Sequence, residues 1–138
     1  PGAPGWKIAV DDPVPGSSQR RYLMLHNLGV GTSGDAYQHL DLNGKRYSHV
    51  VNPTDGMGIS DSVSTTVIAP DGITADALAL GLSILSAPDV LRIADSMEGV
   101  SVSLSRRVGS EIHRFSSRSF RRLLESGKTA PGQAPGDK

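Results

Sequence analysis

The 138-residue sequence contains no cysteine, no excess of charge of either sign and no long hydrophobic run. The absence of cysteine excludes disulfides and thiolate metal sites within the chain, and it leaves the redox compartment open. The 14 basic and 14 acidic residues cancel, so no strong basic field points to a nucleic acid or an anionic membrane as partner. No apolar run approaches the roughly 18 residues of a membrane span. What remains is a chain of single-domain size, whose 37% hydrophobic residues suffice for a modest core.

The order of short strands and helices predicts an α+β fold, with a mainly antiparallel sheet and helices packed on it. A helix is expected over 73–85, where Ala77, Leu78, Gly81, Leu82 and Leu85 fall on one face. Two more are expected behind the capping residues Ser86 and Ser117, the first of them ending at Gly99. The segment 21–26 is apolar on both faces, which predicts an inner strand. Alternating or β-branched residues predict strands at 6–10, 21–26, 36–42, 45–51, 62–69, 100–104 and 111–115.

Glycine marks two of the expected turns. Asn43-Gly44 predicts a tight hairpin, because a type I′ turn needs two positive φ angles. Residues 27–35 are glycine-rich and polar, so we expect a loop there, with Gly34 at a turn. Polar loops on a packed scaffold are where binding chemistry usually lies, which draws attention to the stretch from 32 to 80.

Four segments of that stretch carry a family pattern. They read T-S-G-D at 32–35, N-G-K-R-Y-S-H-V-V-N-P-T-D-G at 43–56, S-T-T-V-I-A-P at 64–70 and A-D-A-L-A-L at 75–80. In this order and spacing they resemble the C-terminal half of the FAD:protein FMN transferase family, also called the ApbE or flavin transferase family. The resemblance covers about residues 5–126. It implies that residues 1–126 form the C-terminal half of an ApbE-like fold, and the Pro/Gly-rich composition of residues 127–138 predicts a disordered tail.

The resemblance also implies a missing half. Family members carry an upstream segment similar to D-L-G-G-I-A-K-G-Y, which this sequence lacks, and the chain starts at Pro1 without Met. We therefore expect a fragment or processed product whose N-terminal half lies on the same precursor or on a separate, associated chain. Family members are often exported, so the resemblance implies an extracytoplasmic location, either periplasmic or membrane-anchored.

The resemblance makes His49 the catalytic residue. An imidazole titrates near neutral pH, so it can take a proton from an attacking hydroxyl. Without the resemblance, a lone histidine on a strand is more often structural. The segment at 32–35 corresponds to the flavin-contacting loop, whose hydroxyls and backbone N–H groups suit a phosphate or the isoalloxazine edge. The implied cofactor-binding residues are Thr32, Ser33, Gly34, Asp35, Ser48 and His49.

Asp76 corresponds to a Mg²⁺ ligand of the family, and we expect it in the first turn of its helix. Magnesium takes hard oxygen ligands and neutralises phosphate charge, whereas an ordinary aspartate there would cap the helix. Four positions on, the family commonly has a metal-facing Thr, but Leu80 offers only its backbone carbonyl. Asn52 replaces a family Asp, and Asp55 replaces a Thr, which adds negative charge where phosphates approach.

The resemblance implies Mg²⁺-dependent transfer of FMN from FAD to a Thr or Ser hydroxyl of a target flavoprotein, with release of AMP. The hydroxyl would attack the FMN-side phosphorus, with His49 as base and Mg²⁺ on Asp76 offsetting pyrophosphate charge. Two alternatives stay open. One is an FAD pyrophosphatase that yields FMN and AMP. The other is a flavin-binding or structural module that has lost catalysis, which Leu80, Asn52 and Asp55 favour.

Overall fold

A computed structural model of the chain describes residues 5–10, 21–34, 39–59 and 62–126. The predicted α+β class is confirmed, and every pair of adjacent strands is antiparallel. The tail at 127–138 and the predicted strand residues 36–38 lie outside the described residues. The helices are α1 (Gly72–Ser83), α2 (Ala87–Ser96) and α3 (Arg118–Ser126). The strands are β1 (Trp6–Val10), β2 (Arg21–Leu25), β3 (Gly29–Gly34), β4 (His39–Leu42), β5 (Lys45–Ser48), β6 (Val63–Ala69), β7 (Ser101–Val108) and β8 (Glu111–Ser116).

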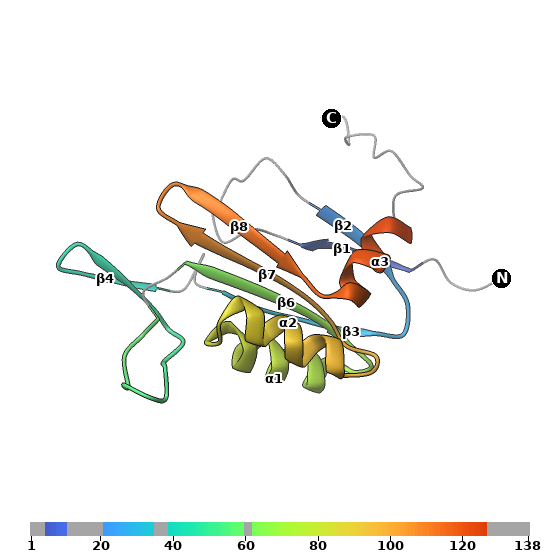
Figure 1. Ribbon diagram of the computed structural model, residues 1–138, viewed down its shortest axis with the longest axis horizontal. Coiled ribbons are helices and arrows are strands. Elements are labelled where there is room, and N and C mark those ends of the chain that lie inside the picture. Colours follow the sequence, from blue (N-terminus) through green and yellow to red (C-terminus); the bar gives the residue numbers. More distant parts are fainter. Residues whose placement is uncertain (1–4, 11–20, 35–38, 60–61, 127–138) are drawn as a thin grey trace.

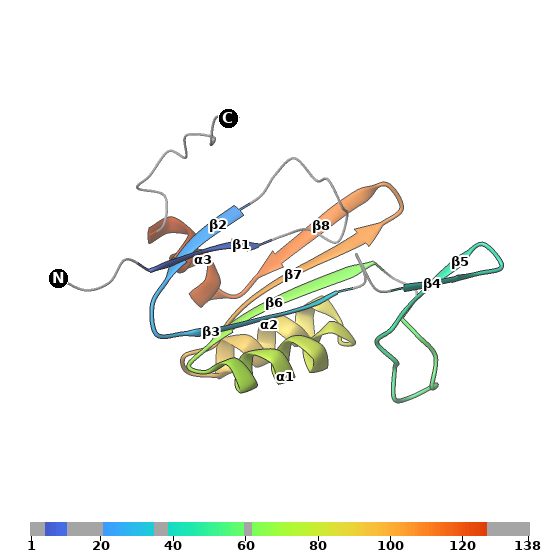
Figure 2. The same cartoon turned by 180° about the vertical axis from the view of Figure 1, so that it is seen from behind.

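The centre of the molecule is a four-stranded sheet in the order β3-β6-β7-β8. Helices α1 and α2 cover one face, while β1, β2 and α3 lie on the other side (Figures 1 and 2). Successive strand residues point to opposite faces, so both faces of β6 and of the first five residues of β7 are buried. Val67, Val102 and Leu104 pack with the two helices. Ile68 joins Phe120 of α3 and apolar residues of β1 and β2 in a second core.

Strand β3 corrects the expectation of a loop at 27–35. Residues 29–34 pair with β6 in the register Gly31↔Val67 and Ser33↔Thr65. The glycines serve close packing here, because a Cβ on Gly31 would lie 2.6 Å from the carbonyl of Ala75 in α1. A Cβ on Gly29 would likewise collide with the backbone where α1 begins. Glycine in a strand often marks such a close approach, and it lets α1 lie directly on β3.

The β4–β5 hairpin projects from the body of the molecule (Figure 2). Asn43 and Gly44 have φ angles of 52° and 75°, which confirms the predicted hairpin turn. The chain then doubles back over residues 48–59, where Ser48 N–H donates to the Ile59 carbonyl at 2.8 Å. This returning segment carries the chain from β5 toward β6.

The prediction of an inner strand at 21–26 was wrong. Among the described strands, β2 pairs only with β1, and its outward face exposes Tyr22 and Met24. Leu23 and Leu25 point inward and are buried, as the alternation of the sequence indicates. Both faces of β2 are apolar, so the residue pattern could not tell an inner strand from one with an open face.

Helix α1 begins where the sequence predicts, and its buried face matches the predicted one only in part. Asp71 is the N-cap, and its carboxylate accepts hydrogen bonds from the backbone N–H and the hydroxyl of Thr74, both at 2.8 Å. These bonds lower the pKa of Asp71. Of the residues predicted inward, Leu82 is buried and Leu78 and Leu85 pack against the core, whereas Ala77 and Gly81 are exposed. The other buried residues of the helix are Ala75, Ala79 and Ser83. None of the three described helices has the length and apolar content of a membrane span.

Candidate functional site

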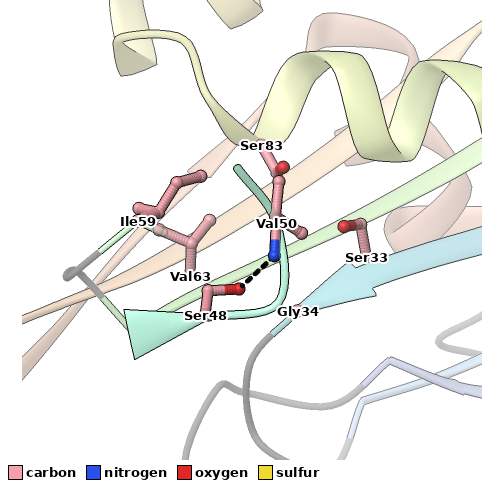
Figure 3. Close-up of a pocket in the computed structure, with 7 residues that line it drawn as sticks. All are labelled: Ser33, Gly34, Ser48, Val50, Ile59, Val63 and Ser83. Carbon is pink, nitrogen blue, oxygen red and sulfur yellow. Dashed lines mark hydrogen bonds between the residues drawn. The ribbon is translucent and has the colours of Figure 1, made fainter. Parts of the chain in front are cut away.

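A small pocket opens where β3, the segment after β5 and the C-terminal end of α1 meet (Figure 3). Its cavity volume of about 10 Å³ is about the least that one water molecule needs, far below the roughly 300–1,000 Å³ of sites that enclose a small molecule. The lining residues are Ser33, Gly34, Ser48, Val50, Ile59, Val63 and Ser83.

Three serine hydroxyls from three different elements meet at this pocket. Ser48 is buried, and its Oγ accepts a hydrogen bond from the Val50 N–H at 3.1 Å. Ser83 is also buried, and its hydroxyl donates to the Leu80 carbonyl at 2.7 Å. The Ser33 hydroxyl has no hydrogen-bond partner among the described residues, and it points toward Val50 in Figure 3. The pocket thus combines polar groups with an apolar wall.

His49 lies beside the pocket but does not line it. Its side chain is exposed, whereas its neighbours Ser48 and Val50 are buried and face the pocket. The imidazole is thus not one of the side chains that line the pocket.

Strand β3 divides the predicted flavin-contacting residues between two faces of the sheet. Ser33 and Gly34 line the pocket. The Thr32 side chain points to the opposite face, where its hydroxyl lies 3.0 Å from the hydroxyl of Thr66 on β6. Asp35 falls outside the described residues. Two of these four residues are thus brought to the pocket.

The loop that follows His49 contains two of the departures from the family pattern. Asn52 Oδ1 accepts the Thr54 N–H, and Asp55 Oδ1 accepts the Met57 N–H, each at 2.9 Å. Both side chains therefore hold the turn of their own loop. An amide oxygen makes such a bond as a carboxylate does, so the loop does not need a charge at position 52.

Asp76, Leu80 and Ser83 form one stripe along α1, because residues at i, i+4 and i+7 share a helix face. Asp76 is the fifth residue of α1, so the prediction of a first-turn position was wrong. Leu80 is half exposed, and its carbonyl already accepts the Ser83 hydroxyl. The described residues contain no cluster of three or more His, Cys, Asp or Glu side chains able to hold a metal.

The sequence prediction missed Ser83. Its one signal is its position seven residues after Asp76, which places it about two turns, or ~10 Å, further along the same stripe. Nothing in the residue type sets it apart from the many other serines of the chain. Ser83 lines the pocket only because the fold brings the end of α1 against β3 and the segment after β5.

Comparison with known proteins gives a consistent set of similarities. The model of the ApbE family matches residues 1–104. The FAD:protein FMN transferases of Haemophilus influenzae and Escherichia coli K12 are each 32% identical, over 88% and 89% of this chain and 36% and 35% of theirs. The crystal structure of the ApbE protein of Thermotoga maritima superposes with a TM-score of 0.75 at 30% identity, covering 89% of this chain and 39% of that one. The chain thus spans about a third of the length of these curated relatives.

Proposed function

Because the chain belongs to the ApbE family, we propose that it carries part of a site for transferring FMN from FAD to a Thr or Ser hydroxyl of a target flavoprotein. AMP is the second product. The observation that carries the proposal is the pocket, which unites Ser33 and Gly34 of the first matched segment with Ser48 of the second. The remaining contacts to FAD would come from an N-terminal half, on the same protein or on a separate chain.

The chemistry is a displacement at the FMN-side phosphorus of FAD. The acceptor hydroxyl oxygen forms the new bond to phosphorus, and the bond to the bridging oxygen breaks so that AMP leaves with that oxygen. His49 takes the proton of the attacking hydroxyl, since an exposed imidazole beside the pocket can reach a group outside it. The pocket holds the flavin and so fixes the distance between phosphorus and acceptor.

Mg²⁺ is the cofactor that the family resemblance implies, and Asp76 is the ligand that we propose for it. Mg²⁺ is commonly bound by one or two carboxylates together with substrate phosphates, so a single carboxylate fits an ion that arrives with FAD. When bound, the ion would neutralise charge on the pyrophosphate. Leu80 offers only a carbonyl that already accepts the Ser83 hydroxyl, which makes it the weaker candidate.

A second candidate function is flavin binding without catalysis. Leu80 favours it, because a half-exposed leucine stands one turn from Asp76, where an oxygen ligand would strengthen a metal site. The two candidates share the pocket and differ in whether the phosphorus reacts.

The test is to incubate the chain with FAD, Mg²⁺ and a Thr-containing acceptor peptide. The products are then separated by chromatography, and the mass of the peptide is measured by mass spectrometry. Flavin transfer predicts AMP together with an FMN-modified peptide. His49→Ala should lower turnover at least about 100-fold, the usual contribution of a general base, while FAD still binds. His113→Ala is the matched control, because His113 is an exposed histidine on β8.

Other products would point elsewhere. Free FMN and AMP with an unmodified peptide would identify an FAD pyrophosphatase. Bound but intact FAD would support the binding module. Equal turnover of His49→Ala and the wild-type chain would remove His49 from the mechanism.

A further inference from the structure

We propose that the exposed leucine face of the β4–β5 hairpin, formed by Leu40 and Leu42, binds the segment of the acceptor flavoprotein that flanks its reacting hydroxyl. The inference rests on the proposed function and goes further, because it names the surface that selects the acceptor. The segment that this surface fits is extended and carries apolar side chains two and four positions from the Thr or Ser.

The leucine face lies on a hairpin that the body of the molecule does not cover. Leu40 is 61% exposed and Leu42 is 53% exposed. Residues two apart in a strand point to the same side, so the two side chains share one face. Among the described strands, β4 and β5 pair only with each other, and their hairpin projects from the rest of the molecule (Figure 2). A two-stranded hairpin alone is marginally stable in water, so a segment laid across the leucine face would stabilise it.

The leucine face leads directly to His49. Strand β5 ends at Ser48, so His49 is the next residue. Exposed apolar side chains continue beyond it, since Val51 and Met57 are both more than half exposed. The Asn52 N–H donates to the Met57 carbonyl at 2.8 Å, which holds the two arms of this loop side by side. An acceptor hydroxyl must come within hydrogen-bond reach of its base, so the acceptor chain on both sides of that hydroxyl meets exposed apolar surface.

The register of the hairpin sets where the apolar residues of the acceptor must lie. Leu40 lies opposite Tyr47, two residues before His49. Leu42 lies opposite Lys45, four residues before His49. A strand advances ~3.3 Å per residue, so the leucines lie ~7 Å and ~13 Å from the level of His49. An extended acceptor with its hydroxyl at His49 therefore brings the residues two and four positions away to the leucines, and their side chains point to the same side as the hydroxyl.

The extent of this surface favours a short segment over a second copy of the chain. A stable protein–protein interface buries about 800 Å² on each partner, from about 20–30 residues a side. The leucine face, Val51 and Met57 together expose four large apolar side chains, far fewer than such an interface needs. Short extended segments bind where a surface accommodates their alternate side chains. The acceptor segment therefore fits this surface better than a second copy does.

The test uses synthetic peptides that have a central Thr. The in-phase peptide has leucine two and four positions to either side of the Thr, and the serine peptide has serine at those positions. By fluorescence anisotropy, the 138-residue chain should bind the in-phase peptide about 10-fold more tightly than the serine peptide, because Leu40 and Leu42 become buried. Leu40→Ser combined with Leu42→Ser should abolish this preference and leave the affinity for FAD unchanged.

A third peptide tests the spacing. The out-of-phase peptide has leucine one and three positions from the Thr, so its leucines and its Thr point to opposite sides of an extended chain. With FAD and Mg²⁺ present, mass spectrometry measures the transfer of FMN to each peptide. Transfer to the in-phase peptide should be at least about 10-fold more efficient, because only this peptide presents the hydroxyl to His49 while its leucines are bound.

Val108→Ser is the matched control. Val108 ends β7 at a different hairpin and is 59% exposed, so it is as accessible as the leucines. Its replacement should leave the affinities for all three peptides and for FAD as they are.

The other outcomes separate the inference from the proposed function. FMN transfer without a preference for the in-phase peptide, or with a preference that survives in the double variant, would overturn the inference and leave the proposed function standing. Self-association that the double variant loses, measured by sedimentation, would overturn it in favour of a second copy. Displacement of the peptide by the separately expressed N-terminal half of a relative would overturn it in favour of that half. Leucine-dependent peptide binding without any FMN transfer would overturn the proposed function, and with it the acceptor as the occupant.

Discussion

Replacing Gly31 by alanine tests the close packing of α1 on β3 that positions the pocket. The new Cβ would lie 2.6 Å from the Ala75 carbonyl and 2.7 Å from the Asp76 nitrogen. Both are backbone atoms of a packed helix, so α1 must move by about 0.8 Å to restore ordinary contact. Overpacking of this kind costs about 1–3 kcal/mol. Alanine recovers roughly 0.5–1 kcal/mol of chain entropy relative to glycine. Because the clash is with helix backbone, we expect the upper end of the overpacking cost and a net loss of about 2 kcal/mol.

The assay is urea unfolding followed by far-ultraviolet circular dichroism, with Gly81→Ala as the control. Gly81 lies on the exposed face of the same helix, and a Cβ there would meet nothing within 4 Å. The control should therefore gain about 0.5–1 kcal/mol from the higher helix propensity of alanine. Flavin affinity should fall in Gly31→Ala and hold in Gly81→Ala, because only the first displaces Ser83. A Gly31→Ala chain as stable as the wild type would refute the packing argument.

Three further predictions concern the core, the link between α2 and α3, and the metal. Phe120 is fully buried, so Phe120→Ala should lower the free energy of unfolding by about 3–5 kcal/mol. A loss below about 1 kcal/mol would contradict the packing of Phe120 in the second core. The Arg118 backbone N–H donates a hydrogen bond to the Asp95 carboxylate at 2.8 Å, and the Arg118 guanidinium lies 3.1 Å from the same carboxylate. Both interactions lower the pKa of Asp95. That stabilisation is present above the ordinary pKa of about 3.9 and is lost as the pH falls through the lowered pKa. The urea midpoint of Asp95→Asn should thus be lower than that of the wild type at pH 7, and the difference between the two midpoints should shrink in acid. A difference that does not change with pH would exclude a stabilising interaction between Asp95 and Arg118. Finally, Mg²⁺ should tighten FAD binding to the wild-type chain but not to Asp76→Asn, and equal tightening in both would remove Asp76 as a ligand.

The sequence predicted most elements where local chemistry decides them. Asn43-Gly44 predicted a turn with two positive φ angles, and Ser86 predicted the N-cap of a helix. The turn and the helix start both lie at these residues. The Ser/Val alternation before Arg106 likewise predicted β7. In each case the signal lies in neighbouring residues, so no distant contact was needed to find the element.

The errors arose where distant contacts decide the structure. Gly29 and Gly31 indicated a loop, because only the arrival of α1 shows why a strand needs them. The exposed face of α1 escaped prediction because the helix is apolar on every side, so its spacing could not select the buried face. Ser83 escaped prediction because its place in the pocket depends on contact with residues 20 to 50 positions earlier in the sequence.

The most direct test of the central claim is hydrogen–deuterium exchange of the chain with and without FAD. A flavin site at the pocket predicts slower exchange in three segments that line it, namely β3, residues 48–59 and the C-terminal end of α1. Helix α3 and the β1–β2 pair should exchange as before. Unchanged exchange around the pocket, or protection confined to α3 and β1–β2, would contradict a flavin site at this place.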